Sequence, residues 1–329
     1  MNSNDITTES KQFCDNGGGF FKLPDRTWLQ LTGQDRAAFL HNFCTADIKK
    51  LAEGEVTELF ILDTRGKTLA FGHVFCCSDS LLISTADGVN SESLRQHLDK
   101  YVIREDVEIQ DVSGDREDLF VLGPSAIEAA NQLIELAQNQ CRVTEVNDQP
   151  VFLAAIELAG FGVLISGKAD GVQVMREFLS DNDVVQFSND VLKSLRLAHG
   201  TPMYGVEIDG SNLPQELRRD EKAISFTKGC YLGQETVAKI DAIGHVNRFL
   251  VGLMFEGEFI DGIEIGCDVT KAGAKIGALQ SFTFSPFLQG TIGLAYVKRN
   301  QADVGNEVVV GDLAAKVTGF PIQARSASE

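Results

Sequence analysis

The feature that most constrains the fold of this chain is an order of elements that occurs twice. Alternating and helical patterns of apolar residues predict strand, helix, three strands, helix and strand, at 28–31, 35–43, 56–62, 69–75, 81–84, 90–101 and 107–110. The same order follows at 119–122, 125–137, 142–146, 151–157, 162–166, 170–179 and 184–185. We therefore predict a duplicated α+β unit whose two sheets face each other or share a cleft, with chance concurrence as the competing explanation.

The remainder of the chain predicts a different architecture. A helix at 188–199 leads into an aperiodic stretch, 200–227, and loops of that length inside compact domains are usually functional. From Phe249 onward, short strands separated by glycines are typical of a small antiparallel barrel. At 329 residues, the chain is expected to hold two or three domains. We divide it into a flexible tail, a first α+β unit, a second α+β unit and a C-terminal β-barrel, at 1–19, 20–112, 113–247 and 248–329.

Composition excludes several functional classes. With 47 acidic and 29 basic residues the formal net charge is −18, which disfavours direct binding to nucleic acid or anionic lipid. No apolar run is long enough to span a membrane, and the start of the chain lacks the features of a signal peptide, so a cytoplasmic location is expected. Seven cysteines without a C-x-x-C pair indicate a reducing compartment, and neither they nor the five scattered histidines predict a metal site.

The most distinctive short segment is 227–235, which places Cys230 between Gly229 and Gly233. Glycines on both sides leave room for a partner to approach the sulfur. A helix that begins near Gly233, together with the charge of Lys228, would favour the thiolate, which is the nucleophilic and metal-binding form. We therefore predict Cys230 and Lys228 as candidate catalytic residues. The alternative is that Cys230 is a small packed hydrophobe in a glycine turn.

Segment 228–235, which reads Lys-Gly-Cys-Tyr-Leu-Gly-Gln-Glu, resembles the signature of the YgfZ family, folate-binding relatives of the glycine cleavage T protein. Segments 195–205, 213–216, 285–286 and 292–297 extend the resemblance to about residues 22–320. It implies a T-protein-like multidomain fold and tetrahydrofolate or a derivative as ligand. It also implies a role in assembly or repair of iron–sulfur clusters in client proteins, including tRNA-modifying enzymes, through assembly factors or the clients themselves.

The resemblance also assigns candidate folate-binding residues. Arg196, which alone would read as a solvated helix charge, stands where the T-protein arginine helps to bind a substrate or folate carboxylate. Trp28, the single tryptophan, matches a residue of the folate pocket, although burial in the core is the commoner fate of tryptophan. Gln234 in the signature and Arg248 after it complete the set, and a structural role for Arg248 is equally open.

Two departures from the family pattern bear on catalysis. The acidic residue that serves aminomethyl transfer shortly after the glycine hairpin is absent from 69–72, and the glutamate that grips the pterin is absent from 160–163. We therefore expect a folate-binding protein that does not catalyse aminomethyl transfer. The enzyme alternative is tetrahydrofolate-dependent one-carbon transfer with a carboxylate from elsewhere, such as Asp63. A third possibility, a direct tRNA-binding modifier, is disfavoured by the charge.

Overall fold

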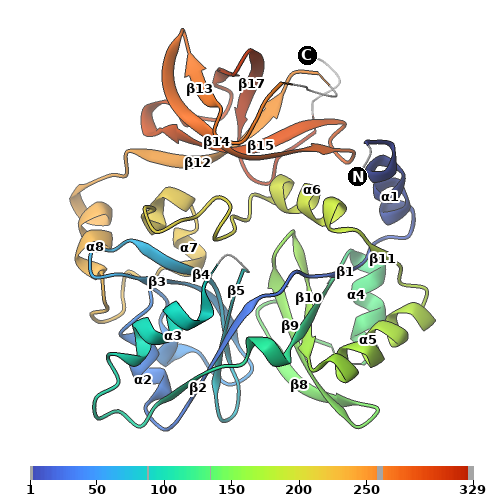
Figure 1. Ribbon diagram of the computed structural model, residues 1–329, viewed down its shortest axis with the longest axis vertical. Helices are drawn as coiled ribbons and strands as arrows, with labels where there is room; N and C mark the ends of the chain where they lie inside the picture. The colour runs from blue at the N-terminus through green and yellow to red at the C-terminus, as the bar shows by residue number, and fades with distance from the viewer. Residues whose placement is uncertain (1–2, 87–88, 134, 258–261, 325–329) are drawn as a thin grey trace.

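A computed structural model describes residues 3–86, 89–133, 135–257 and 262–324 (Figure 1). The first unit is a five-stranded sheet in the order β3-β4-β5-β2-β6. Its elements are β2 (Thr27–Thr32), α2 (Arg36–His41), β3 (Val56–Leu62), β4 (Thr68–Cys76), β5 (Leu81–Thr85), α3 (Ser91–Asp99) and β6 (Glu108–Asp111). Helices α2 and α3 cover one face of this sheet, where Leu40 and Leu98 are completely buried against strand residues such as Leu29.

The second unit repeats this order. Its elements are β7 (Glu117–Leu122), α4 (Pro124–Asn131), β8 (Cys141–Val146), β9 (Gln149–Glu157), β10 (Phe161–Gly167), α5 (Ala169–Asp181) and β11 (Gln186–Phe187). They form a sheet in the order β8-β9-β10-β7-β1-β11, which matches the first sheet strand for strand except that β1 (Gly19–Lys22) lies between β7 and β11. The strand order thus confirms the predicted duplication. It also places 19–22, the last residue of the predicted tail and the first three of the predicted first unit, in the second sheet.

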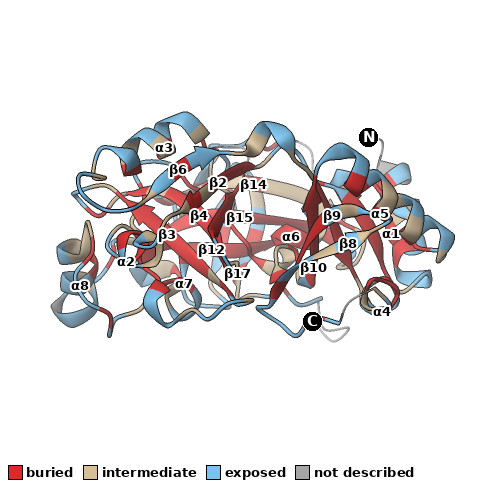
Figure 2. Ribbon diagram, turned by 90° about the horizontal axis from the view of Figure 1, so that it is seen from below, coloured by how far each residue is buried: buried red, intermediate tan, exposed pale blue. Residues whose placement is uncertain are grey.

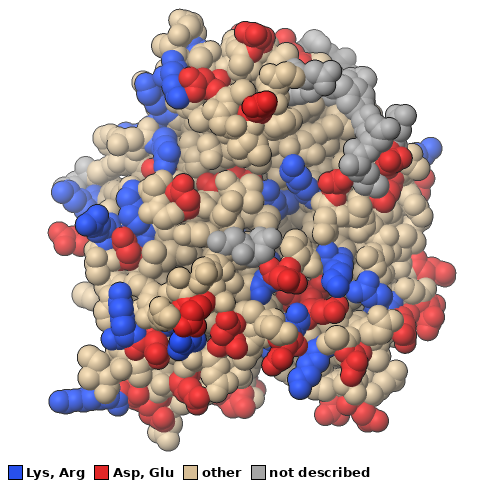
Figure 3. All heavy atoms as spheres, in the orientation of Figure 1, with Lys and Arg blue, Asp and Glu red and all other residues tan. Residues whose placement is uncertain are grey.

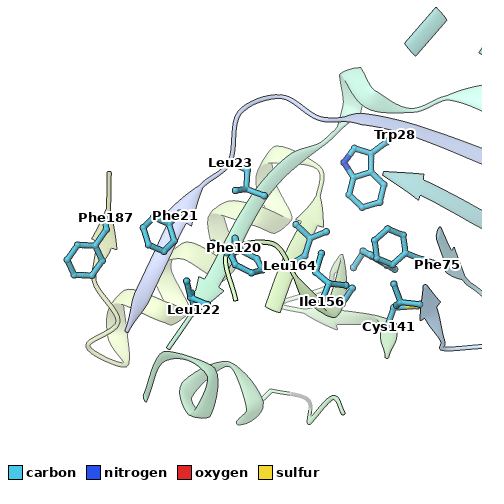
Figure 4. Close-up of a cluster of buried hydrophobic side chains, with 14 of the residues drawn as sticks. Phe21, Leu23, Trp28, Phe75, Phe120, Leu122, Cys141, Ile156, Leu164 and Phe187 are labelled. Carbon is cyan, nitrogen blue, oxygen red and sulfur yellow. The ribbon is translucent and has the colours of Figure 1, made fainter. Parts of the chain in front are cut away.

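The two sheets pack face to face. Along β7, Leu119 and Val121 pack toward α4 and α5, whereas the alternate residue Phe120 packs toward the other sheet, as the two-residue period of a strand requires. Between the sheets, Trp28 stacks on Phe75 of the first unit. Figure 2 shows that buried residues are concentrated on the inner strands, and Figure 4 shows the side chains that meet between the sheets.

The barrel and the segment that leads to it complete the chain. The segment contains α6 (Asn189–His199), α7 (Asp220–Ala223) and α8 (Gln234–Ile243). The strands β12 (Arg248–Phe255), β13 (Asp268–Lys271), β14 (Ala274–Ser285), β15 (Gly290–Lys298), β16 (Glu307–Val310) and β17 (Leu313–Thr318) close an antiparallel barrel. Short 3₁₀ helices occur at Ile48–Lys50, Ser113–Asp115, Pro214–Leu217 and Arg299–Gln301. The predicted barrel is confirmed and begins at Arg248, and Figure 1 shows it lying across α6.

The predicted flexible tail at 1–19 is wrong over the residues that the structure describes. Ser3–Asp15 form helix α1, whose buried residues Ile6 and Phe13 are seven positions apart and therefore share one face. After the helix, Gly18 has a φ of 132°, and an added Cβ would lie 2.3 Å from the carbonyl oxygen of Leu122. The glycine run is thus a close backbone contact that feeds β1. Residues 1 and 2, and 325–329 at the end of the predicted barrel, lie outside the described residues.

None of the helices in the described ranges is long and apolar enough to cross a membrane. The longest of them, α1 and α5, have 13 residues each, whereas a span requires about 20.

We predict that Phe13→Ala will lower the free energy of unfolding by about 3 kcal/mol, because its ring packs on Phe21, Phe187 and Phe287 and its loss leaves a cavity. Denaturant unfolding followed by near-ultraviolet circular dichroism measures this change. Lys11→Ala, an exposed position on the same helix, is the control. Equal midpoints for the two variants would contradict the docking of α1.

Candidate functional site

A cavity of about 270 Å³ opens where the two units meet α6. Its walls come from the β1–β2 connection, β4, the ends of β5 and β9, α6 and the turn that follows α6. The lining residues are Leu23, Pro24, Arg26, Phe71, Gly72, His73, Ala86, Leu158, Ala159, Asn189, Leu192, Lys193, Arg196, Thr201, Pro202, Met203, Tyr204 and Val206. Segments distant in the sequence therefore contribute to one mostly apolar pocket.

The charged side chains of this cavity are all basic. Arg26, Lys193 and Arg196 line it, and no aspartate or glutamate is among its described lining residues. Arg26 donates from Nε to the hydroxyl of Ser84 at 2.9 Å, and Lys193 is exposed on α6. The exposed Lys193 favours an anionic ligand at its end of the cavity although the whole chain is strongly acidic. Figure 3 shows acidic and basic side chains interspersed over the visible face.

Arg196 lies in this cavity as part of a buried ion pair. Its Nη1 donates to the carbonyl of Thr201 at 2.7 Å and to Oε2 of Glu207 at 2.9 Å, and its Nη2 donates to Oε1 of Glu207 at 3.0 Å. Glu207 also accepts from the backbone N–H of Met203 at 2.9 Å and from the hydroxyl of Ser281 at 2.5 Å. Three of the five guanidinium N–H groups are thus committed within the protein.

His73 is a cavity residue that the sequence analysis did not single out. It lies on β4 between Glu58 of β3 and Ser84 of β5, and its ring stacks on Phe75. Burial, followed by the nearby charge of Arg26, lowers the pKa of His73 to about 3. The imidazole is therefore uncharged at neutral pH, and its Nδ1 has no hydrogen-bond partner within the described chain.

Trp28 lies in the core between the sheets (Figure 4). The side chain is completely buried, and its Nε1 donates to Oδ2 of Asp118 at 2.9 Å. The guanidinium of Arg116 lies 4.8 Å from the centre of its ring. Trp28 is not among the lining residues, so the structure supports the core alternative rather than the predicted contact with folate. The reason is that Asp118 satisfies the indole N–H inside the core.

Lys228 anchors the signature segment to the chain after α2. Its Nζ donates to the carbonyl oxygens of His41, Cys44 and Ala46 at 2.6, 2.7 and 2.6 Å, which uses all three of its donors. Burial lowers the pKa of Lys228, and the ring of Tyr231 lies 4.8 Å from its Nζ. The amine predicted to activate Cys230 is thus fully occupied as a structural tie.

Cys230 is exposed, and an added Cβ on the neighbouring Gly229 would meet no atom within 4 Å. Gly233 precedes α8 with a φ of 81°, and a Cβ there would lie 2.6 Å from the carbonyl oxygen of Asp63. The predicted exposure of the thiol and the predicted start of the helix are therefore both found. However, Cys230 does not line the cavity, and Figures 1 and 2 both place α8 at an outer end of the molecule and α6 near its centre.

The remaining candidates also lie outside the cavity lining. Gln234 is the first residue of α8. Arg248 begins β12, where its guanidinium lies 4.4 Å from the centre of the Tyr296 ring and 3.2 Å from Oε2 of Glu216. Asp63 accepts the backbone N–H groups of Arg65 and Lys67 at 2.8 Å, so its carboxylate organises the β3–β4 turn. Of the predicted set, only Arg196 contributes to the cavity.

Known proteins resemble this chain in both the α+β units and the barrel. Residues 4–223 match the model of the GCVT N-terminal domain, and residues 248–322 match that of the glycine cleavage T-protein C-terminal barrel domain. The glycine cleavage system aminomethyltransferase T from Bartonella henselae superposes with a TM-score of 0.80 at 19% identity, over 96% of this chain and 89% of that one. The T-protein-like fold expected from the resemblance is thus confirmed.

Two named relatives align with most or nearly all of this chain. A putative chloroplastic transferase of Arabidopsis thaliana is 27% identical, over 99% of this chain and 76% of its own. An aminomethyltransferase of Caldanaerobacter subterraneus subsp. tengcongensis is 25% identical, over 90% and 81%. These are proteins to which this chain is similar.

The depressed pKa of His73 predicts a specific pH dependence of stability. Because the folded pKa is about 3 and the unfolded one about 6.5, the unfolded state binds more protons between these values, and stability falls as the pH is lowered through this window. Between pH 7 and pH 5 the wild type should lose about 2 kcal/mol more than His73→Gln in urea unfolding. His245→Gln, at an exposed position, should follow the wild type. Parallel behaviour of His73→Gln and wild type would contradict a buried neutral imidazole.

Proposed function

Because this chain belongs to the glycine cleavage T-protein family, we propose that its central cavity binds tetrahydrofolate or a derivative, and that the protein supports iron–sulfur cluster assembly or repair. The aminomethyltransferases of this family use tetrahydrofolate. The observation that carries the proposal is the cavity, which combines apolar walls and three basic side chains with no carboxylate among its described lining residues. The resemblance of 228–235 to the YgfZ signature supplies the role in cluster assembly.

The cavity residues fit the parts of a folate. Its volume of about 270 Å³ is close to the lower limit of small-molecule sites, roughly 300 Å³, and suits a flat ring more than the complete molecule. Phe71 and Leu192 offer apolar surface for the ring, and the neutral His73 offers a polar contact. The acidic tail would then extend toward the exposed Lys193.

The residues of the cavity wall explain why we do not propose aminomethyl transfer as the function. In the segment where the family acid is missing, Ala70 packs on the side of α2 and α3, and Phe71 lines the cavity. Proton transfer in a transition state requires a positioned acid or base within hydrogen-bonding reach. The ring of Phe71 supplies none, and the lowered pKa of the neighbouring His73 makes that imidazole a weak base, so we infer that a bound folate acts as a ligand that is retained rather than consumed.

The exposed thiol supports a role in contact with clients. Lys228 fixes the backbone of the signature segment at its N-terminal side, and Gly233 packs on the β3–β4 turn at the other side. Cys230 is thus presented to solvent on a segment held at both ends. An iron–sulfur client or assembly factor could reach this sulfur without entering the cavity.

A second candidate function, aminomethyl transfer, is favoured by the names of several relatives. It would require a carboxylate from outside the described cavity lining, such as Asp63. An assay for release of methylene-tetrahydrofolate from an aminomethyl donor distinguishes the two functions. Activity that is abolished by Asp63→Asn would favour transfer, and its absence at saturating folate would favour the folate-binding role.

Titration with 5-formyltetrahydrofolate tests the cavity. We expect saturable binding to the wild type, and an affinity at least about tenfold weaker for Lys193→Glu, because the substitution reverses a charge beside the anionic tail. Lys168→Glu reverses a charge at another exposed lysine, outside this cavity, and should leave affinity unchanged. No binding to the wild type, or equal losses in both variants, would count against a folate site here.

The role in cells is tested at Cys230. In cells that lack the wild-type protein, Cys230→Ser should leave the activity of an iron–sulfur enzyme as low as no protein at all, because serine cannot supply thiolate chemistry. Cys14→Ser, which replaces another exposed cysteine, should restore that activity fully. Full restoration by Cys230→Ser at equal protein abundance would refute the thiol role.

A further inference from the structure

Three of the seven cysteines come together at the junction of the two units, far along the chain from the signature segment. Cys76 ends β4 in the first sheet, Cys77 follows it directly, and Cys141 begins β8 in the second sheet. Backbone hydrogen bonds of Gly54 hold them in place, since its N–H donates to the carbonyl of Cys76 at 2.8 Å and its carbonyl accepts from the N–H of Cys141 at 2.7 Å. The carbonyl of Glu55 accepts from the N–H of Cys76 at 3.0 Å.

The side chains of the two adjacent cysteines pack in different clusters. Cys76 packs with the cluster under α2 and α3, whereas Cys77 packs with the cluster between the sheets, to which Cys141 also belongs. The sulfur of Cys141 lies 3.8 Å from the carbonyl oxygen of Glu55, which also accepts from the N–H of Cys76, the residue next to Cys77. Figure 4 shows Cys141 beneath Phe75 in this inter-sheet cluster.

We propose that Cys77 and Cys141 form a dithiol site that a hydroperoxide converts to a disulfide joining the two α+β units. Cys77 is the half-buried, accessible partner, whereas Cys141 is buried. The two thiols pack in one cluster, and Gly54 hydrogen-bonds to the backbone of both segments that carry them, so the fold brings both sulfurs to the same region between the sheets. Cys76 is excluded because its side chain lies on the opposite face of the sheet.

Formation of the disulfide requires only the hydroperoxide and the two thiols, without a cofactor. The Cys77 thiolate attacks one oxygen of the hydroperoxide, the O–O bond breaks, and Cys77 becomes a sulfenic acid while the departing oxygen takes a proton to leave as an alcohol or water. The sulfur of Cys141 then attacks the sulfenic sulfur, the S–O bond breaks, and the thiol proton leaves with the oxygen as water. The peroxide is reduced by two electrons, and the two thiols are oxidised to one disulfide.

The surroundings support this order of events. Interaction with Cys141 lowers the pKa of Cys77, whereas burial and the charge of Asp79 raise it and the guanidinium of Arg116 lowers it. Exposure decides the order, because Cys77 is half-buried and Cys141 is buried. A hydroperoxide therefore reaches Cys77 first, and Cys141 is the resolving thiol.

Mass spectrometry of the full-length protein treated with hydrogen peroxide tests the site. After alkylation of the remaining thiols and digestion without reductant, we expect a linked peptide pair joining residue 77 to residue 141 in the wild type and in Cys76→Ser. The pair should be lost in Cys77→Ser and in Cys77→Ala, and dithiothreitol should reverse its formation. Because Cys76 and Cys77 are adjacent, Cys76→Ser is the variant that assigns the link.

Thermal unfolding provides a second measurement. The disulfide closes a long loop, so oxidation should raise the midpoint of the wild type by roughly 5 °C and leave that of Cys77→Ala unchanged. A link through Cys76, or oxidation of Cys77 to sulfinic acid without a link, would overturn the proposal. A reaction confined to the exposed Cys14 and Cys230 would overturn it as well.

Discussion

The buried ion pair between Arg196 and Glu207 is the interaction on which the arrangement around the cavity depends. It joins the end of α6 to the following turn, and Glu207 extends the connection to the barrel by accepting from Ser281 and, through its carbonyl, from the hydroxyl of Tyr296 at 2.9 Å. Removing one partner would leave the other charge buried and uncompensated, which costs about 3–5 kcal/mol. The cavity wall, the barrel and α6 are therefore held by the same group that a ligand carboxylate could approach.

Lys228 is a second polar anchor, which fixes the position of the signature segment 228–235. Lys228 donates to three backbone carbonyls. Gly233 permits a close approach to the backbone of Asp63 that any side chain would block. Lys228 and Gly233 thus fix the segment on either side of Cys230, which is exposed to solvent. The folate proposal and the thiol proposal consequently concern two separate regions, which could act in sequence but do not share atoms.

Much of the fold was predictable because its information is local. The two-residue and 3.6-residue periods of apolar side chains located most strands and helices, and the repeated order revealed the duplication. Helix α1 was missed because only Ile6 and Phe13 of its apolar face are buried, and both depend on partners distant in the chain. The insertion of β1 into the second sheet was also missed, because a four-residue strand carries almost no periodicity.

By itself, the sequence determined the α+β repeat, the barrel and the exposure of Cys230, because these follow from periodicity and from glycine positions along neighbouring residues. Only the tertiary structure decided which side chains share a cavity. It placed Trp28 in the core beside Asp118, brought His73 and Lys193 to the pocket, and tied Lys228 to carbonyls about 180 residues earlier. Such contacts depend on how sheets stack and where buried polar groups find partners, and no local pattern encodes either.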